Sequence, residues 1–116
     1  MKSARLPDYL QHIRQAAQRA RDFVAGMTRE GFERDLRTQQ AVEMNLIVMG
    51  EAASRVLEHH ADFAQRHPQL PWREMRGMRN RMAHGYFDIN LDVVWNTVQA
   101  ALPALLAQLD ALPADV

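Results

Sequence analysis

Hydrophobic residues recur every three or four positions along most of this chain, with polar residues between them. Leu6, Leu10, Ile13 and Ala17 begin one such stripe, and the opposite face of that segment is polar. This spacing is typical of amphipathic helices that bury one face. The stripes predict helices from Leu6 to Gly26, from Thr28 to Leu36, from Thr38 to Pro68, from Pro71 to about Ala83–Gly85, and from Asn90 to Leu109.

Residues at the expected helix ends support these boundaries. Thr28, Thr38 and Asn90 are of the types that accept hydrogen bonds from the first turn of a helix. Pro68 cannot continue a helix interior, and Pro71 suits the first position of the next helix. The pattern therefore divides the chain into helices joined by short loops.

The elements together predict an all-α fold, an antiparallel bundle of four to five helices that forms one domain over residues 1–116. Gly50 lies inside the longest apolar pattern, where glycine costs about 1 kcal/mol against alanine. That cost indicates either the close approach of another helix or an exposed position. Pro103 lies inside the last helix and is expected to kink it, because proline removes one backbone hydrogen bond.

The composition of the chain mainly excludes certain kinds of site and protein class. The formal net charge is zero, which does not favour binding of nucleic acid through bulk electrostatics. Cysteine is absent, so disulfides and thiolate metal sites are excluded. No apolar run approaches the ~18 residues of a membrane span, and the first residues lack the apolar region of a signal peptide. We therefore expect a cytoplasmic protein that does not contact membranes.

Positive charge is concentrated in one stretch, from Arg66 to Phe87, in which Glu74 is the only acidic residue. The arginines of this stretch are Arg66, Arg73, Arg76, Arg79 and Arg81. A local cationic patch on a neutral protein suits contact with one or two phosphates better than a long non-specific track. Arg73, Arg76 and Arg81 are possible RNA contacts, although a solvated helix face is the simpler interpretation.

Arg79 and His84 are the candidate catalytic residues of this stretch. An imidazole can move the protons of RNA cleavage, and a guanidinium can bind the scissile phosphate without a metal ion. Asn80 is a supporting candidate that could donate to the phosphate or hold the His84 ring. Five residues on an ideal helix place Arg79 and His84 roughly 140° apart. They meet only if the helix ends before His84, with Gly85 at positive φ, or if a second copy of the chain supplies the partner group; we expect both.

Other polar residues carry weaker signals. His59, His60 and His67 lack a spacing that suits a metal ion, so we expect neither a metal nor a cofactor. Asn45 and Glu51 interrupt the apolar pattern of the longest helix. They are either buried hydrogen-bonding groups that hold helix packing or, for Glu51, a group that orients the candidate site.

The octet Arg79-Asn80-Arg81-Met82-Ala83-His84-Gly85-Tyr86 resembles the Arg-x4-His-x-Tyr motif of HepT-type toxins, within the HEPN superfamily. The resemblance extends over almost the whole chain. It includes residues 40–53, residues 71–80, the segment Asp92-Val93-Val94-Trp95 and the pair Leu102-Pro103.

This resemblance implies a homodimeric helical endoribonuclease that acts on RNA as the toxin of a toxin–antitoxin pair. Its partner would be a nucleotidyltransferase antitoxin of the MntA type. In the family the motif arginine and histidine are catalytic, which corresponds to Arg79 and His84. The motif tyrosine accepts AMP from the antitoxin, which corresponds to Tyr86, although the Tyr86 ring could instead pack on the bundle. The alternative function is a non-catalytic HEPN module that binds nucleotide and regulates a minimal nucleotidyltransferase.

Overall fold

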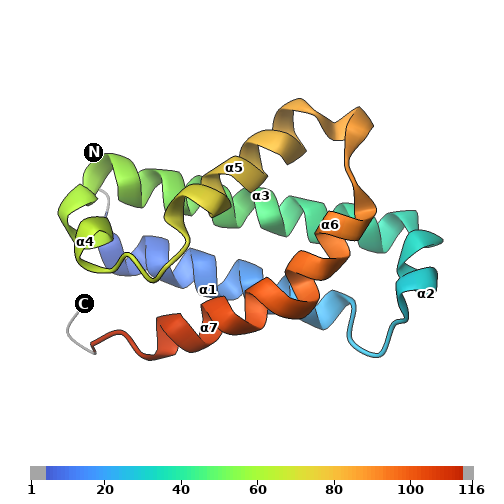
Figure 1. Cartoon of the computed structure of the whole chain (residues 1–116), viewed down its shortest axis with the longest axis horizontal. Helices are drawn as coiled ribbons and strands as arrows, with labels where there is room; N and C mark the ends of the chain where they lie inside the picture. The colour runs from blue at the N-terminus through green and yellow to red at the C-terminus, as the bar shows by residue number, and fades with distance from the viewer. Residues whose placement is uncertain (1–4, 114–116) are drawn as a thin grey trace.

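The computed structural model describes residues 5–113 and shows an antiparallel bundle of helices (Figure 1). Its elements are α1 (Leu6–Phe23), α2 (Arg29–Glu33), α3 (Leu36–His59), α4 (Ala61–Arg66), α5 (Trp72–His84), the 3-10 turn η1 (Tyr86–Asp88), α6 (Leu91–Asn96), the π-helical turn η2 (Thr97–Ala101) and α7 (Leu102–Asp110). No strand is present between residues 5 and 113, and the predicted all-α class is confirmed. None of the helices in this part of the chain is long and apolar enough to cross a membrane.

Helix α3 lies at the centre of the bundle. It packs along α1 on one side and along α5 on the other, and α7 packs against α1. The chain reverses direction from α1 to α3, again to α5, and again to α7 (Figure 1). The buried residues of α1 include Ala16, Ala17 and Ala20, whose small side chains let α3 approach closely. Burial of these one-sided apolar stripes is the main favourable term in folding.

The ends of the helices confirm two of the three predicted N-caps. Thr28 and Asn90 each accept hydrogen bonds from backbone N–H groups in the first turns of α2 and α6. The prediction for Thr38 is wrong, because Asp35 caps α3 three residues earlier. The backbone N–H and the hydroxyl of Thr38 both donate to the Asp35 carboxylate, at 3.0 Å and 2.8 Å. These bonds favour the charged carboxylate and hold the pKa of Asp35 below its ordinary value.

The prediction of one helix reaching Pro68 is also wrong. Helix α3 ends just before His60, and α4 begins just after it. The His60 ring lies 6.1 Å from the ring of Tyr9, near the start of α1, so a straight continuation of α3 would run past the end of its partner helix. Helix α4 instead folds across the end of the bundle and buries Phe63 (Figure 1).

Near Pro103, where a kink is expected, the helix contains a π-helical turn. Segment η2 lies directly before α7, and Pro103 occupies the first turn of α7. The N–H of Leu102 donates to the carbonyl of Thr97, five residues back. Proline cannot donate from its own nitrogen, so the backbone around it changes its pattern of hydrogen bonds. Figure 1 shows the corresponding change of direction between α6 and α7.

Candidate active site

Helix α5 presents its arginine cluster on the face turned away from the core. Its buried side is formed at helical spacing by Trp72, Met75, Met78 and Met82. The exposed side carries Arg73, Arg76, Asn80 and Arg81. None of these four makes an ion pair or a side-chain hydrogen bond with another residue between positions 5 and 113. Pro71 precedes α5 as its N-cap residue, one position before the place expected for it.

Gly50 sets the distance between α3 and α5. A Cβ atom placed on this buried glycine would lie 2.5 Å from the carbonyl oxygen of Met75 and would overlap the Cβ atom of Arg79. Real side chains do not approach so closely, so α5 can hold this position only against a glycine. Of the two explanations offered for Gly50, close helix approach is confirmed. The consequence is that the first atoms of the Arg79 side chain lie directly on α3.

Two residues of α3 hold the guanidinium of Arg79. Its Nη1 donates to Oε1 of Glu51 at 2.9 Å, and its Nη2 donates to Oγ of Ser54 at 3.0 Å. Its Nε is buried without a hydrogen-bond partner in the described structure. A guanidinium has two N–H bonds on each Nη atom, so one N–H on each remains available for a ligand. The side chain is 24% exposed, and the group is thus held in one orientation while still reaching solvent.

The structure also shows the contacts of Glu51 and Asn45, whose roles the sequence leaves open. Glu51 pairs with Arg79 and also lies 3.5 Å from Arg55, so it holds the guanidinium of Arg79 in place. Asn45 donates to the carbonyl of Ala41 within its own helix, and no hydrogen bond within residues 5–113 joins its side chain to the site residues. Ser54 was missed by the sequence analysis. The available signal was a hydroxyl one turn after Gly50 in an otherwise apolar stripe, where the structure shows it buried.

His84 does not converge with Arg79 inside one chain. Helix α5 continues through His84, so the expectation that it ends earlier is wrong. Gly85 has φ −129°, outside the left-handed region, and the expectation of positive φ is wrong as well. The N–H of Gly85 donates to the carbonyl of Arg81, which keeps the last turn helical. On this unbroken helix the two side chains point roughly 140° apart, and His84 is exposed.

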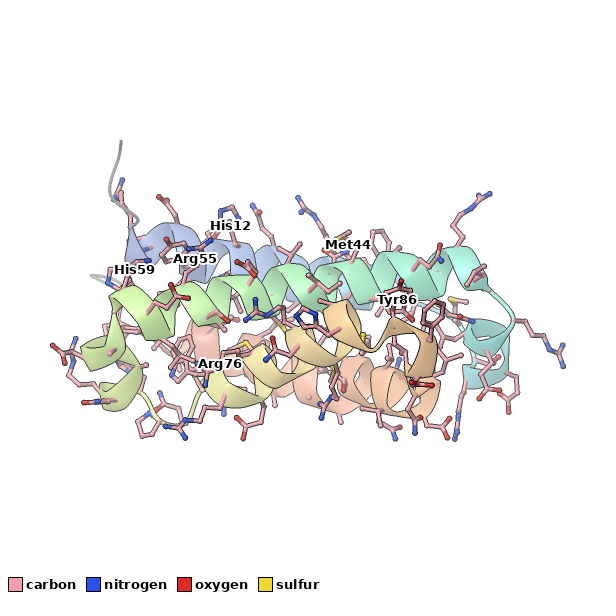
Figure 2. The ribbon with its side chains drawn as sticks, turned by 90° about the horizontal axis from the view of Figure 1, so that it is seen from above. His12, Met44, Arg55, His59, Arg76 and Tyr86 are labelled. Carbon is pink, nitrogen blue, oxygen red and sulfur yellow. The ribbon has the colours of Figure 1, made fainter. Side chains whose placement is uncertain are left out.

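Tyr86 is accessible in the turn that follows α5. It lies in η1 and is 62% exposed, and its ring contacts only the neighbouring Phe87 ring among the aromatic pairs of residues 5–113, at 4.5 Å between centroids. The alternative of a ring packed on the bundle is therefore wrong. Figure 2 shows Tyr86 and Arg76 near opposite ends of the α5 surface. The arginines before Arg79 thus extend the cationic surface away from the tyrosine.

This chain resembles known proteins over most of its length. It matches the family model described as Ribonuclease HepT-like over residues 13–112. It is 36% identical over 105 residues to "Probable ribonuclease HepT" of Thermococcus cleftensis, which covers 90% of this chain and 93% of that protein. It is 35% identical over 95 residues to a protein of Methanocaldococcus jannaschii named "Putative RNase", covering 82% of this chain and 76% of the relative. No solved structure matches the chain.

Proposed function

The chain belongs to the HepT-like family of ribonucleases, and from this premise we propose that it is a metal-independent endoribonuclease acting as the toxin of a toxin–antitoxin pair. The observation that supports this function best is the orientation of Arg79, held by Glu51 and Ser54 with two N–H groups unused. Guanidinium N–H groups that remain unused in this way can donate to the oxygens of a phosphate.

The proposed reaction needs only a proton carrier and a phosphate clamp. His84 takes the proton of the RNA 2′-hydroxyl, and the 2′-oxygen bonds to phosphorus. The bond from phosphorus to the 5′-oxygen breaks, and that oxygen receives a proton from an imidazole. Arg79 stabilises the negative charge that gathers on the phosphate oxygens. The products are a 2′,3′-cyclic phosphate and a 5′-hydroxyl end.

We propose that the complete site forms between two copies of the chain, because one copy leaves Arg79 and His84 apart. A twofold axis would supply the histidine of one copy to the arginine of the other. The proposed contact is the solvent face of α3, where Met44 and Val48 are exposed one turn apart. Figure 2 shows Met44 and Arg55 along the same side of the molecule. Exposed apolar side chains gathered on one helix face favour a protein contact.

The dimer is tested by sedimentation together with cleavage. Met44→Glu places a charge in the proposed contact, and we expect it to yield monomers that no longer cleave RNA. Phe23→Glu is the control, because Phe23 is an exposed apolar residue at the end of α1. Monomeric parent protein that cleaves RNA at full rate would contradict a shared site.

The catalytic roles are tested by incubating purified protein with RNA in EDTA. We expect cleavage that leaves cyclic phosphate ends, and a loss of roughly 10²–10⁴-fold for His84→Ala, the usual worth of a general acid or base. Arg79→Ala should lose a comparable factor. His59→Ala is the control, since His59 is exposed on α3. If both site variants cleave as fast as the parent while circular dichroism shows intact helices, the assignment fails.

We further propose that an MntA-like nucleotidyltransferase antitoxin inactivates the enzyme by adding AMP to Tyr86. A phosphodiester on this exposed phenol would bring negative charge and bulk beside the cationic surface of α5 and compete with RNA for it. Co-expression with the antitoxin should add about 329 Da per AMP to the intact mass. Tyr86→Phe should remove that gain, and Tyr9→Phe should keep it. A modification that persists in Tyr86→Phe would place the acceptor elsewhere.

A further inference from the structure

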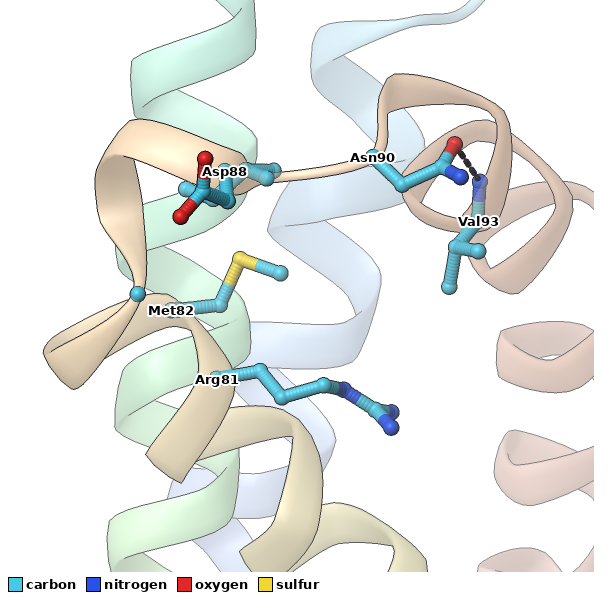
Figure 3. Close-up of a pocket in the computed structure, with 7 residues that line it drawn as sticks. Arg81, Met82, Asp88, Asn90 and Val93 are labelled. Atoms are coloured by element: carbon cyan, nitrogen blue, oxygen red, sulfur yellow. Dashed lines mark hydrogen bonds between the residues drawn. The ribbon is translucent and has the colours of Figure 1, made fainter.

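A second feature of the motif region is a pocket that the catalytic proposal does not use. It has a volume of about 280 Å³ and lies between the end of α5, the turn η1 and the start of α6 (Figure 3). Gly85, which directly follows His84, lines it. A Cβ atom at this glycine would lie only 3.1 Å from the carbonyl oxygen of Arg81, so a glycine suits this position on the pocket wall.

The pocket combines apolar walls with exposed polar groups that have few protein partners. Met82, Ile89 and Val93 provide the apolar surface. Arg81 and Asp88 both line the pocket, yet no ion pair joins them and neither side chain has a hydrogen-bond partner within residues 5–113. Both side chains are exposed at the pocket, so a ligand there can exchange their bonds to water for bonds of its own.

Asn90 adds a directed donor to this set. Its Oδ1 accepts from the N–H groups of Asp92 and Val93, at 2.9 Å and 3.3 Å, which caps α6. The oxygen is thereby occupied, and the amide nitrogen remains as a donor in a residue that lines the pocket. The pocket thus offers donors from Arg81 and Asn90, an acceptor from Asp88, and apolar surface between them.

We propose that this pocket binds one nucleobase of the RNA strand beside the scissile phosphate, an inference that rests on the proposed ribonuclease function. A base has two apolar faces and an edge that carries both donors and acceptors, and single-stranded RNA is commonly recognised by such inserted bases. Guanine fits the charges best, since its N1–H and N2–H groups can donate to Asp88 while its O6 accepts from Arg81. A free phosphate does not fit, because it would meet the Asp88 carboxylate and gain nothing from apolar walls.

AMP attached to Tyr86 also carries a nucleobase, and is thus a second source of a base for this pocket. We assign the pocket to RNA because Tyr86 does not line it and instead lies exposed against Phe87. The position directly after His84 also suits a base one nucleotide from the reacting phosphate. The pocket would then set which base stands next to the cut.

Binding can be measured without any cleavage, by titrating the full chain with each of the four nucleoside 3′-monophosphates in a calorimeter. We expect the guanosine nucleotide to bind most tightly. Val93→Trp fills the pocket and should weaken binding at least tenfold, while Asp88→Asn should abolish the preference for guanosine. Leu36→Trp and Asp62→Asn are the matched controls, at exposed positions outside the pocket. Circular dichroism checks that every variant is folded.

Binding that Val93→Trp leaves unchanged, or equal binding of all four nucleotides by the parent and Asp88→Asn, overturns the proposal. Sequencing the ends of the cleaved RNA shows whether the base in the pocket comes from RNA or from AMP attached to Tyr86. Val93→Trp should alter the base next to the cut, and an unchanged base there would mean that the pocket does not read RNA. If the protein binds nucleotides as expected but does not cleave RNA, the proposed ribonuclease function is wrong. The proposal that the pocket binds a nucleobase would still hold.

Discussion

The close contact between α3 and α5 at Gly50 predicts that alanine at this position destabilises the protein, although helix propensity alone favours alanine. Replacing a helical glycine with alanine ordinarily stabilises by about 1 kcal/mol. In Gly50→Ala, however, the new Cβ would stand 2.5 Å from the carbonyl oxygen of Met75, and ordinary contact begins at 3.4 Å. The two backbones would have to separate by at least about 0.9 Å to clear this oxygen, and by more to clear the Cβ atom of Arg79. Overpacking of this kind typically costs about 1–3 kcal/mol. We therefore expect Gly50→Ala to be less stable than the parent, despite its better propensity.

The same shift should disturb the candidate site. Arg79 donates to Glu51 and Ser54 at 2.9 Å and 3.0 Å, and a retreat of about 0.9 Å by α5 would carry both contacts beyond hydrogen-bonding range. RNA cleavage by Gly50→Ala should accordingly fall even at temperatures where the variant remains folded. This loss would come from misplacement of the guanidinium, because Gly50 itself carries no functional group.

Thermal unfolding followed by circular dichroism provides the measurement, with Gly77→Ala as the matched control. Gly77 lies inside α5, and a Cβ there would meet nothing within 4 Å. At roughly 4 °C per kcal/mol for a chain of this size, Gly77→Ala should raise Tm by up to about 4 °C, and Gly50→Ala should lower it by several degrees. A Gly50→Ala protein that melts above the parent would refute the close packing of α3 and α5.

Three further substitutions test other contacts. Glu51→Gln should lower kcat for RNA more than tenfold with little change in KM, because it weakens the bond that orients Arg79; Glu58→Gln, which affects only surface ion pairs in the described structure, should leave both unchanged. An equal loss of kcat in Glu51→Gln and Glu58→Gln would show that Glu51 does not position Arg79. Burial raises the pKa of Glu43 above its ordinary value of 4.5, so its charged form opposes folding and stability is lost as pH rises through the raised pKa. Glu43→Gln should therefore be more stable than the parent in urea at pH 7, and the difference should vanish below about pH 4; a constant difference would contradict the burial effect. Asn90→Ala removes the cap of α6 and should cost about 1 kcal/mol in urea unfolding, whereas an unchanged midpoint would show that the cap is not needed.

The two misplaced boundaries of α3 have a common physical origin. Thr38 and Asp35 are both acceptable caps, and the choice depends on where α2 ends. The buried amide of Gln39 donates to the carbonyls of Phe32 and Glu33, at 2.9 Å and 3.0 Å, which holds α2 against the start of α3. Likewise no local sequence signal marks the break at His60. It occurs where α3 reaches the end of α1, the helix against which it packs. Both boundaries were decided by contacts between elements.

The sequence by itself determined the helices, their buried faces, two of their caps and the motif that contains Arg79, His84 and Tyr86. These features depend on a 3.6-residue period and on hydrogen bonds within one turn, which are local properties. Only the tertiary structure decided that Arg79 reaches Glu51 and Ser54, which lie 28 and 25 residues away along the chain. That contact requires a particular spacing and register of two packed helices, and no local pattern encodes a distance between helices. The structure also shows α5 helical through His84, where the N–H of Gly85 donates to the carbonyl of Arg81, so one chain presents the arginine and the histidine apart.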